Sequence, residues 1–130
     1  MIWLLDVSAL LAFGFTEHEF HPRVAAWVAS EKSAAFASCP ITELGFVRIL
    51  AHTGPYGLPV AHARETLIRL KRAAGFAFIP DDLDISHLPA WVRTSAQSTD
   101  GYLVQLARAH GATLATLDRK IPGSFVVPVL

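Results

Sequence analysis

The segment spanning residues 99–118 constrains the fold more than any other part of the sequence. Ser98 or Thr99 can cap a helix that begins here, and Gly111 can end it in the left-handed conformation that most side chains disfavour. Apolar residues recur at helical spacing between these points, which gives the helix one buried face. The short apolar run over residues 113–117 then predicts a buried strand.

Two acidic residues, Asp100 and Asp118, bracket this helix–strand unit. We expect Asp100 in the first helical turn and Asp118 directly after the strand. A helix that runs antiparallel to the following strand returns its own start to the far end of that strand, so the two carboxylates can meet. Carboxylates at one point repel each other unless a cation lies between them.

The rest of the chain alternates between short apolar runs and helical patterns. Strands are expected over residues 2–5, 34–38, 76–79, 113–117 and 125–129, and further helices over 9–13, 22–30, 40–50, 60–74 and 86–94. Alternation of this kind predicts an α/β fold with three α/β/α layers and a central, mainly parallel sheet. A chain of 130 residues has the size of one such domain, spanning residues 1–130.

Isolated acidic residues also follow the first two strands. Asp6 comes directly after the first strand, and Glu43 lies in the first turn of the helix after the second. Ligand sites in open α/β sheets lie at the carboxyl ends of the strands, so Asp6, Glu43 and Asp118 would share one edge, where Asp100 would join them. Taken alone, Asp6 is better explained by helix capping and Glu43 by the helix dipole than by a site. The joint placement of all four indicates a site.

Two other groups of polar residues have simpler interpretations. Asp81, Asp82 and Asp84 are close together in sequence and are expected to splay apart in a solvated turn. His18 and His21 have metal-ligand spacing, but they are expected in a loop, where few histidines are ligands.

The helix over residues 60–74 has a basic polar face, formed by Arg64, Arg69, Lys71 and Arg72. Such a face is usually solvated, and contact with RNA phosphates is the alternative. The same two interpretations apply to Arg48.

Composition limits the classes of partner. Basic and acidic residues both number 11, so the net charge gives no bulk signal for nucleic acid. If four acids hold a metal, the remaining surface has 11 bases against 7 acids. Hydrophobic residues make up 52% of the chain, more than a lone monomer needs, so part of this surplus is expected to face a partner. The single cysteine, Cys39, excludes an intrachain disulfide and is expected to be buried.

Four motifs spread over the whole chain resemble those of the PIN domain, and more narrowly those of the VapC-type toxins of bacterial toxin–antitoxin modules. These motifs are Leu4-Leu5-Asp6-Val7-Ser8, Thr42-Glu43-Leu44-Gly45-Phe46-Val47-Arg48, Thr99-Asp100 before a Leu/Ala-rich helix, and Ala115-Thr116-Leu117-Asp118. His18 and His21 match a weaker feature of the same group.

The resemblance implies a metal-dependent RNA endonuclease that uses Mg²⁺ or Mn²⁺, forms a homodimer and is held silent by a cognate, VapB-like antitoxin. The catalytic residues that it implies are Asp6, Glu43, Asp100 and Asp118, with the hydroxyls of Ser8 and Thr116 in support.

Metal chemistry suggests how these acids divide the work. Mg²⁺ keeps several waters and binds only one or two carboxylates directly, so Asp6 and Asp100 are the expected direct ligands. Asp118 would bind a second ion or act through water, and Glu43 would hold or deprotonate the attacking water. The two hydroxyls would orient the carboxylates.

Three other classes of protein are alternatives to this interpretation. A phosphatase of the haloacid dehalogenase type needs a second Asp two residues after Asp6, where this chain has Ser8. A receiver domain needs paired acids before its phosphorylated Asp and a later lysine, and neither is evident. A non-catalytic PIN-like module for dimerisation or antitoxin docking is the alternative from a different class.

The aromatic residues Phe13, Phe15, Phe20 and Trp27 exceed what a small core readily holds. We expect part of this surface, together with the groove toward the helix over residues 60–74, to receive an antitoxin segment whose arginine reaches the acids. The apolar runs are too short to cross a membrane, and the first residues lack the basic start of a signal peptide. A soluble, cytoplasmic protein is therefore expected.

Overall fold

A five-stranded parallel sheet lies at the centre of the computed structural model, which describes residues 1–130. The strands are β1 (Ile2–Leu5), β2 (Ala35–Ser38), β3 (Ala77–Phe78), β4 (Thr113–Thr116) and β5 (Phe125–Val126). They are arranged in the order β3-β2-β1-β4-β5, and every neighbouring pair is parallel. The predicted α/β fold is confirmed. The chain order changes direction at β1, where β2 pairs on one side and β4 on the other, so their carboxyl ends meet there.

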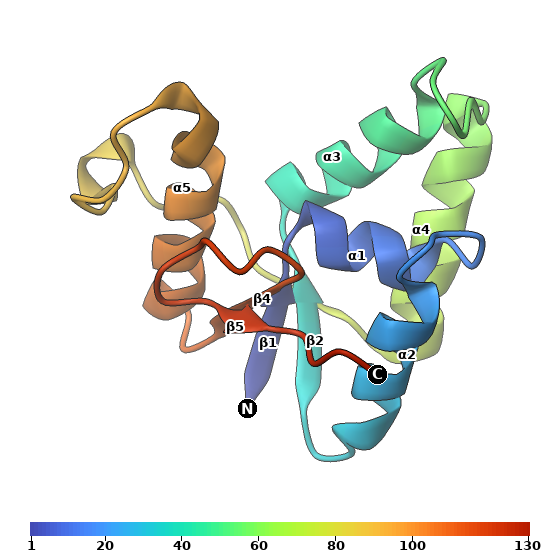
Figure 1. The fold of residues 1–130 in the computed structure, drawn as a ribbon, viewed down its shortest axis with the longest axis horizontal. Helices are drawn as coiled ribbons and strands as arrows, with labels where there is room; N and C mark the ends of the chain where they lie inside the picture. Colours follow the sequence, from blue (N-terminus) through green and yellow to red (C-terminus); the bar gives the residue numbers. More distant parts are fainter.

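Helices cover both faces of the sheet (Figure 1). The helices are α1 (Val7–Gly14), α2 (His21–Ser30), α3 (Pro40–Ala51), α4 (Val60–Ala74) and α5 (Ser95–Ala109), with a short 3₁₀ turn, η1 (Ile85–His87). Figure 1 shows α5 on one side of the sheet and α1 to α4 on the other. No helix combines the length and apolar composition that a bilayer crossing requires.

Residues that alternate along β1 form two separate cores, because successive side chains of a strand point to opposite faces. Trp3 and Leu5 pack with α1 to α4, whereas Leu4 packs with the buried face of α5. The middle strand is therefore buried on both sides, as its continuous apolar sequence predicts.

The segment before α5 differs most from its prediction. The helix expected over residues 86–94 is wrong: only the 3₁₀ turn η1 forms, and the chain then continues as turns. Helix α5 begins earlier than expected, because Thr94 and Gln97 form a capping box at its start. Asp100 therefore lies in the second turn of α5, not in the first.

The last strand is also shorter than expected. It comprises only Phe125–Val126, and Pro128, which has no N–H for the ladder, follows soon after.

The expected aromatic docking surface is likewise corrected. Trp27 is buried, packing edge-on against Trp3 and Phe36, while Phe13 and Phe15 are half-buried against the same core. Only Phe20 is exposed. The core therefore takes up Trp27 and part of Phe13 and Phe15, and the aromatic surface is smaller than expected. Phe15 also lines a hollow toward α4.

Candidate active site

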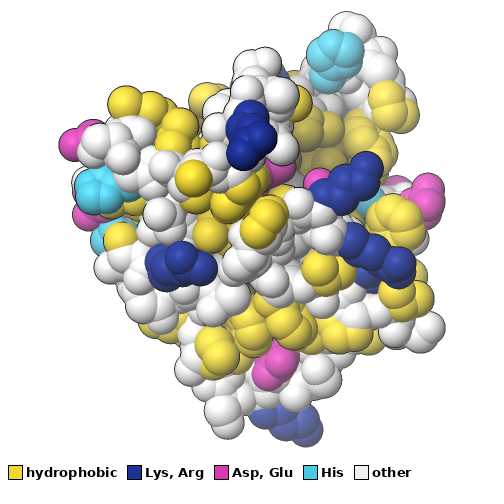
Figure 2. Space-filling view, turned by 60° about the vertical axis from the view of Figure 1, so that its left-hand side comes forward, with side chains coloured by type: hydrophobic (Ala, Val, Ile, Leu, Met, Phe, Trp, Pro, Cys, Tyr) yellow, Lys and Arg dark blue, Asp and Glu magenta, His cyan; other side chains and the backbone are white.

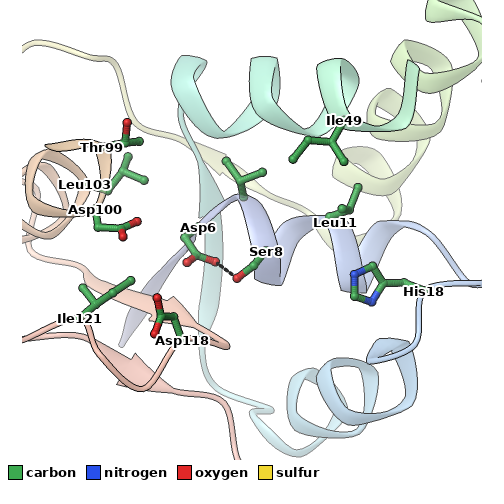
Figure 3. A pocket seen from close by; sticks show the side chains of 11 residues that line it. Asp6, Ser8, Leu11, His18, Ile49, Thr99, Asp100, Leu103, Asp118 and Ile121 are labelled. Atoms are coloured by element: carbon green, nitrogen blue, oxygen red, sulfur yellow. Dashed lines mark hydrogen bonds between the residues drawn. The ribbon is translucent and has the colours of Figure 1, made fainter. Parts of the chain in front are cut away.

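Three aspartates line one pocket at the carboxyl edge of the sheet, here called the acid pocket. Figure 3 shows the carboxyl groups of Asp6, Asp100 and Asp118 facing a common space. Asp6 follows β1, Asp118 follows β4 and Asp100 comes from α5, so the pocket lies at the point where the strand order changes direction. Its volume is about 370 Å³, and its other lining residues are Val7, Ser8, Leu11, His18, Ile49, Thr99, Leu103 and Ile121.

Asp6 is the most constrained of the three aspartates. Its backbone N–H extends the sheet by bonding the carbonyl of Ala115 (3.0 Å). Its side chain is buried, and Oδ1 accepts hydrogen bonds from the Ala9 N–H (2.9 Å) and the Ser8 hydroxyl (2.8 Å). Thr116 Oγ1 donates to Oδ2. Asp6 therefore caps α1 and lines the pocket at once, so the capping interpretation and the site interpretation both describe it.

The environment of Asp6 opposes its negative charge. Burial raises the pKa of Asp6, and the charge of Asp118 adds to this effect, while the hydrogen bonds from Thr116, Ala9 and Ser8 act in the other direction. A buried carboxylate that accepts three hydrogen bonds is held in one orientation, as a metal ligand must be, and it keeps one of its roughly four lone-pair positions for a ligand.

Thr116 links Asp6 to Asp118. Its hydroxyl donates to Asp6 and accepts the backbone N–H of Asp118 at 3.0 Å. One side chain on β4 thus fixes the carboxylate of Asp6 and the backbone position of Asp118.

Asp100 has no hydrogen-bond partner of this kind. Burial raises the pKa of Asp100, and the charges of Asp6 and Asp118 raise it further. The next residue, Gly101, holds this part of α5 close to the preceding segment, because a Cβ there would collide with Val92 and press on Pro89. This close approach positions Asp100 at the pocket.

The donor set suits a hard divalent cation. The pocket presents three carboxylates and neither Lys nor Arg, so no permanent positive charge in its lining compensates the mutual repulsion of the three acids. No three acidic, histidine or cysteine side chains converge closely enough to surround one ion together. This geometry fits an ion such as Mg²⁺, which binds one or two carboxylates and fills its other positions with water.

Glu43, the fourth expected acid, does not line the acid pocket. It lies in the first turn of α3 as predicted, but Oε2 accepts hydrogen bonds from Lys71 Nζ and Ser38 Oγ, both at 2.6 Å. It faces a separate hollow between α3 and α4. The structure thus brings together three of the four predicted acids and pairs the fourth with a lysine of α4.

His18 is a pocket residue that the sequence interpretation assigned to a plain loop. Its Nδ1 accepts the backbone N–H of Phe20 at 3.0 Å, so Nε2 is the atom left to contact a ligand. Burial lowers the pKa of His18, which favours the neutral ring. The companion His21 bonds the Ala12 carbonyl at 2.8 Å and does not line the pocket. The path of the loop after α1 therefore decides that His18 lines the acid pocket and His21 does not.

The other polar groups mostly follow their simpler interpretations. Asp82 pairs with His110, Asp84 bonds Ser86, and neither lines the acid pocket. On α4, Arg69 pairs with Glu65. Figure 2 shows the Lys and Arg side chains of one face spread among apolar and uncharged atoms rather than gathered in one patch.

Comparison with known proteins supplies the family. The PIN domain model matches residues 3–123. Ribonuclease VapC38 of Mycobacterium tuberculosis (strain ATCC 25618 / H37Rv) is 38% identical over 121 residues, which cover 88% of this chain and 84% of the relative. Ribonuclease VapC29 of Mycobacterium tuberculosis (strain CDC 1551 / Oshkosh) is 37% identical over 119 residues, covering 91% and 86%.

A solved structure has the same fold. The crystal structure of VapBC2 from Rickettsia felis, bound to a DNA fragment from their promoter, aligns with a TM-score of 0.63 and covers 96% of each chain. Its sequence is only 14% identical, so this likeness concerns the fold alone.

Proposed function

The chain belongs to the PIN-domain family and is homologous to VapC ribonuclease toxins, and on that premise we propose that it is a metal-dependent endoribonuclease, the toxin of a type II toxin–antitoxin module. The observation that supports this most strongly is the convergence of Asp6, Asp100 and Asp118 in one pocket whose lining contains no Lys or Arg. RNA is the proposed substrate because the relatives are ribonucleases.

Mg²⁺ or Mn²⁺ is the proposed cofactor, held directly by Asp6 and Asp100, with Asp118 as a ligand of a second ion or of a bound water. When bound, the ion lowers the pKa of the attacking water and neutralises charge that develops on the phosphate. The residues of the chain do the positioning. Ser8 and Thr116 keep the Asp6 carboxylate aimed into the pocket, and Thr116 also fixes the start of the Asp118 segment.

Glu43 is proposed to hold or deprotonate the attacking water. Its carboxylate is engaged by Lys71 and Ser38, so this role requires it to leave Lys71 and turn toward the acid pocket. Lys71 therefore controls how much of the Glu43 side chain is available for the reaction.

A VapB-like antitoxin and a second copy of this chain are the proposed protein partners. The VapBC name of the structural neighbour supports the first. Exposed apolar side chains on α3 and α4, namely Leu44 and Val60, support a surface that a partner covers. An arginine from the antitoxin would offset the charge of the acid pocket.

Incubation of the purified chain with cellular RNA and Mn²⁺, followed by sequencing of the RNA ends, tests the proposed function. We expect discrete new ends that disappear with a chelator and fall at least about 100-fold in the Asp6→Asn variant. Asp81→Asn removes an acid outside the pocket and should cleave as wild type does. Equal cleavage by wild type and Asp6→Asn, or no cleavage by either, would leave the non-catalytic docking module as the better description.

A further inference from the structure

A second hollow adjoins the acid pocket at the carboxyl end of α3. Its volume is about 260 Å³, and it is lined by Arg48, Ile49, His52, Pro55 and Tyr56. Ile49 also lines the acid pocket, so the two cavities share a wall. A ligand that occupies the acid pocket can extend over Ile49 into this hollow, which we call the flanking hollow.

Internal hydrogen bonds shape the loop that forms the flanking hollow. The carbonyl of His52 accepts the N–H of Gly57 at 3.1 Å, and the carbonyl of Leu50 accepts the N–H of Leu58 at 2.9 Å. Gly57 has a positive φ of 56°, a conformation that glycine adopts without strain. The ring of Tyr56 packs edge-on against Phe15, with 4.9 Å between their centroids. The wall is therefore formed before any ligand arrives.

The side chains of the flanking hollow offer three kinds of contact. None of the three ion pairs of the chain uses Arg48, so its guanidinium is available for an anion. Tyr56 supplies an aromatic ring. His52 accepts the N–H of Gly54 on Nδ1 at 3.2 Å, which leaves Nε2 as the contact atom.

A nucleotide has a group for each of these contacts. Its phosphate matches the cation, its base stacks on the aromatic ring, and its sugar or the edge of its base matches the polar ring nitrogen. We propose that the flanking hollow is a nucleotide subsite. The nucleotide next to the scissile phosphate stacks its base on Tyr56, and Arg48 binds the phosphate of that nucleotide. The inference rests on the proposed function, because the shared wall at Ile49 relates the hollow to the acid pocket. The subsite also explains how a chain of zero net charge with an acidic site can hold RNA, which is a polyanion. Arg48 and Tyr56 lie beside the acid pocket rather than inside it.

RNA binding at several salt concentrations tests this subsite. All proteins carry Asp100→Asn so that the RNA stays intact, and the probe is a short, fluorescently labelled, single-stranded RNA of mixed sequence read by anisotropy. Arg48→Ala should reduce the slope of log Kd against log salt by about 0.7, the value for one phosphate contact on a single strand. Tyr56→Ala should weaken binding roughly tenfold without changing the slope, since stacking is not ionic.

Two controls separate the subsite from charge and folding effects. Lys32→Ala removes one positive charge at the opposite edge of the sheet, between α2 and β2, and should leave the slope unchanged. Tyr56→Phe keeps the ring and should bind as the parent does, which shows that the ring and not the hydroxyl makes the contact. Because this ring also packs against Phe15, the Tm of Tyr56→Ala is measured as well, and an unchanged Tm shows that its weaker binding is not loss of the loop. The subsite is overturned if Arg48→Ala and Tyr56→Ala both bind RNA as the parent protein does.

Failure of this inference is distinct from failure of the proposed function. RNA cleavage by the wild-type chain, abolished by Asp6→Asn, supports the function whatever the subsite variants show. Normal cleavage kinetics in Arg48→Ala and Tyr56→Ala, beside an active wild type, would overturn the subsite alone.

Discussion

Asp6 and Asp100 face the same pocket, yet the chain treats their charges differently. Asp6 accepts three hydrogen bonds, from Ser8, Ala9 and Thr116. Asp100 accepts none of this kind, and burial and the neighbouring acids raise the pKa of its carboxyl. The Asp6 carboxylate is part of the folded framework. The Asp100 carboxylate is a cost to the fold that a bound cation would relieve.

The first prediction concerns stability and pH in Asp100→Asn. Because the folded-state pKa of Asp100 is raised above the ordinary 3.8, the folded chain loses stability as the pH rises through this range and the group ionises. Without divalent metal at pH 7, the neutral amide should therefore raise Tm. At a pH well below 3.8 the gain should vanish, because the wild-type carboxyl is then protonated in both folded and unfolded chains.

Thermal unfolding across this pH range, in a chelator, measures the effect. Asp6→Asn is the matched comparison: its amide cannot accept all of the hydrogen bonds of the carboxylate, so it should not be stabilised. A gain for Asp100→Asn that persisted at acid pH would show that charge repulsion is not its source.

The second prediction concerns Thr116, whose buried hydroxyl bonds both Asp6 and the Asp118 backbone. Thr116→Val keeps the shape and removes the hydroxyl, so it should lower the free energy of unfolding by about 2 kcal/mol. RNA cleavage should fall about 10- to 100-fold, as when a group that orients a metal ligand is lost. Thr116→Ser retains the hydroxyl and should recover most of the cleavage; equal loss in both variants would contradict the orienting role.

At the scale of helices and strands, the sequence was most informative where local chemistry decides the outcome. Helix α4 has its predicted bounds, because Gly75 ends it with a positive φ of 65°. The helix predicted over residues 86–94 is absent, and α5 begins at Ser95, because the capping box of Thr94 and Gln97 starts that helix earlier than expected. That pattern is readable in sequence.

The meeting of the three aspartates could be predicted, because parallel strands end at one edge and a returning helix brings Asp100 to it. The pairing of Glu43 with Lys71 could not, since it joins the start of α3 to the last turn of α4 through side-chain geometry alone. The position of His18 depends on a loop path that no periodicity encodes.

The third prediction tests the Glu43–Lys71 pair between α3 and α4. If Lys71 withholds Glu43 from the reaction, Lys71→Met should raise kcat severalfold at saturating RNA. In a Glu43→Gln background the same substitution should have no such effect, because interaction energies appear only when both partners are present. A fall in cleavage from Lys71→Met in both backgrounds would contradict this and indicate a direct contact with RNA.

At the scale of the whole molecule, the sheet order determines where the site lies. Strand β1 is central, and the parallel strands β2 and β4 lie on opposite sides of it. The edge where the three strands end holds the acid pocket, between α5 and the helices of the other face (Figures 1 and 3). The two cores are built on alternate residues of β1, so folding itself brings Asp6 between the layers. The site is thus a product of the entire fold rather than of one motif.

Titration of the chain with Mn²⁺ by calorimetry tests the cation site most directly. We expect wild type and Asp81→Asn to bind Mn²⁺ alike, and Asp6→Asn and Asp100→Asn to lose at least about tenfold in affinity. Undiminished binding in Asp6→Asn and Asp100→Asn, or none in wild type, would contradict the claim that these aspartates together hold the metal.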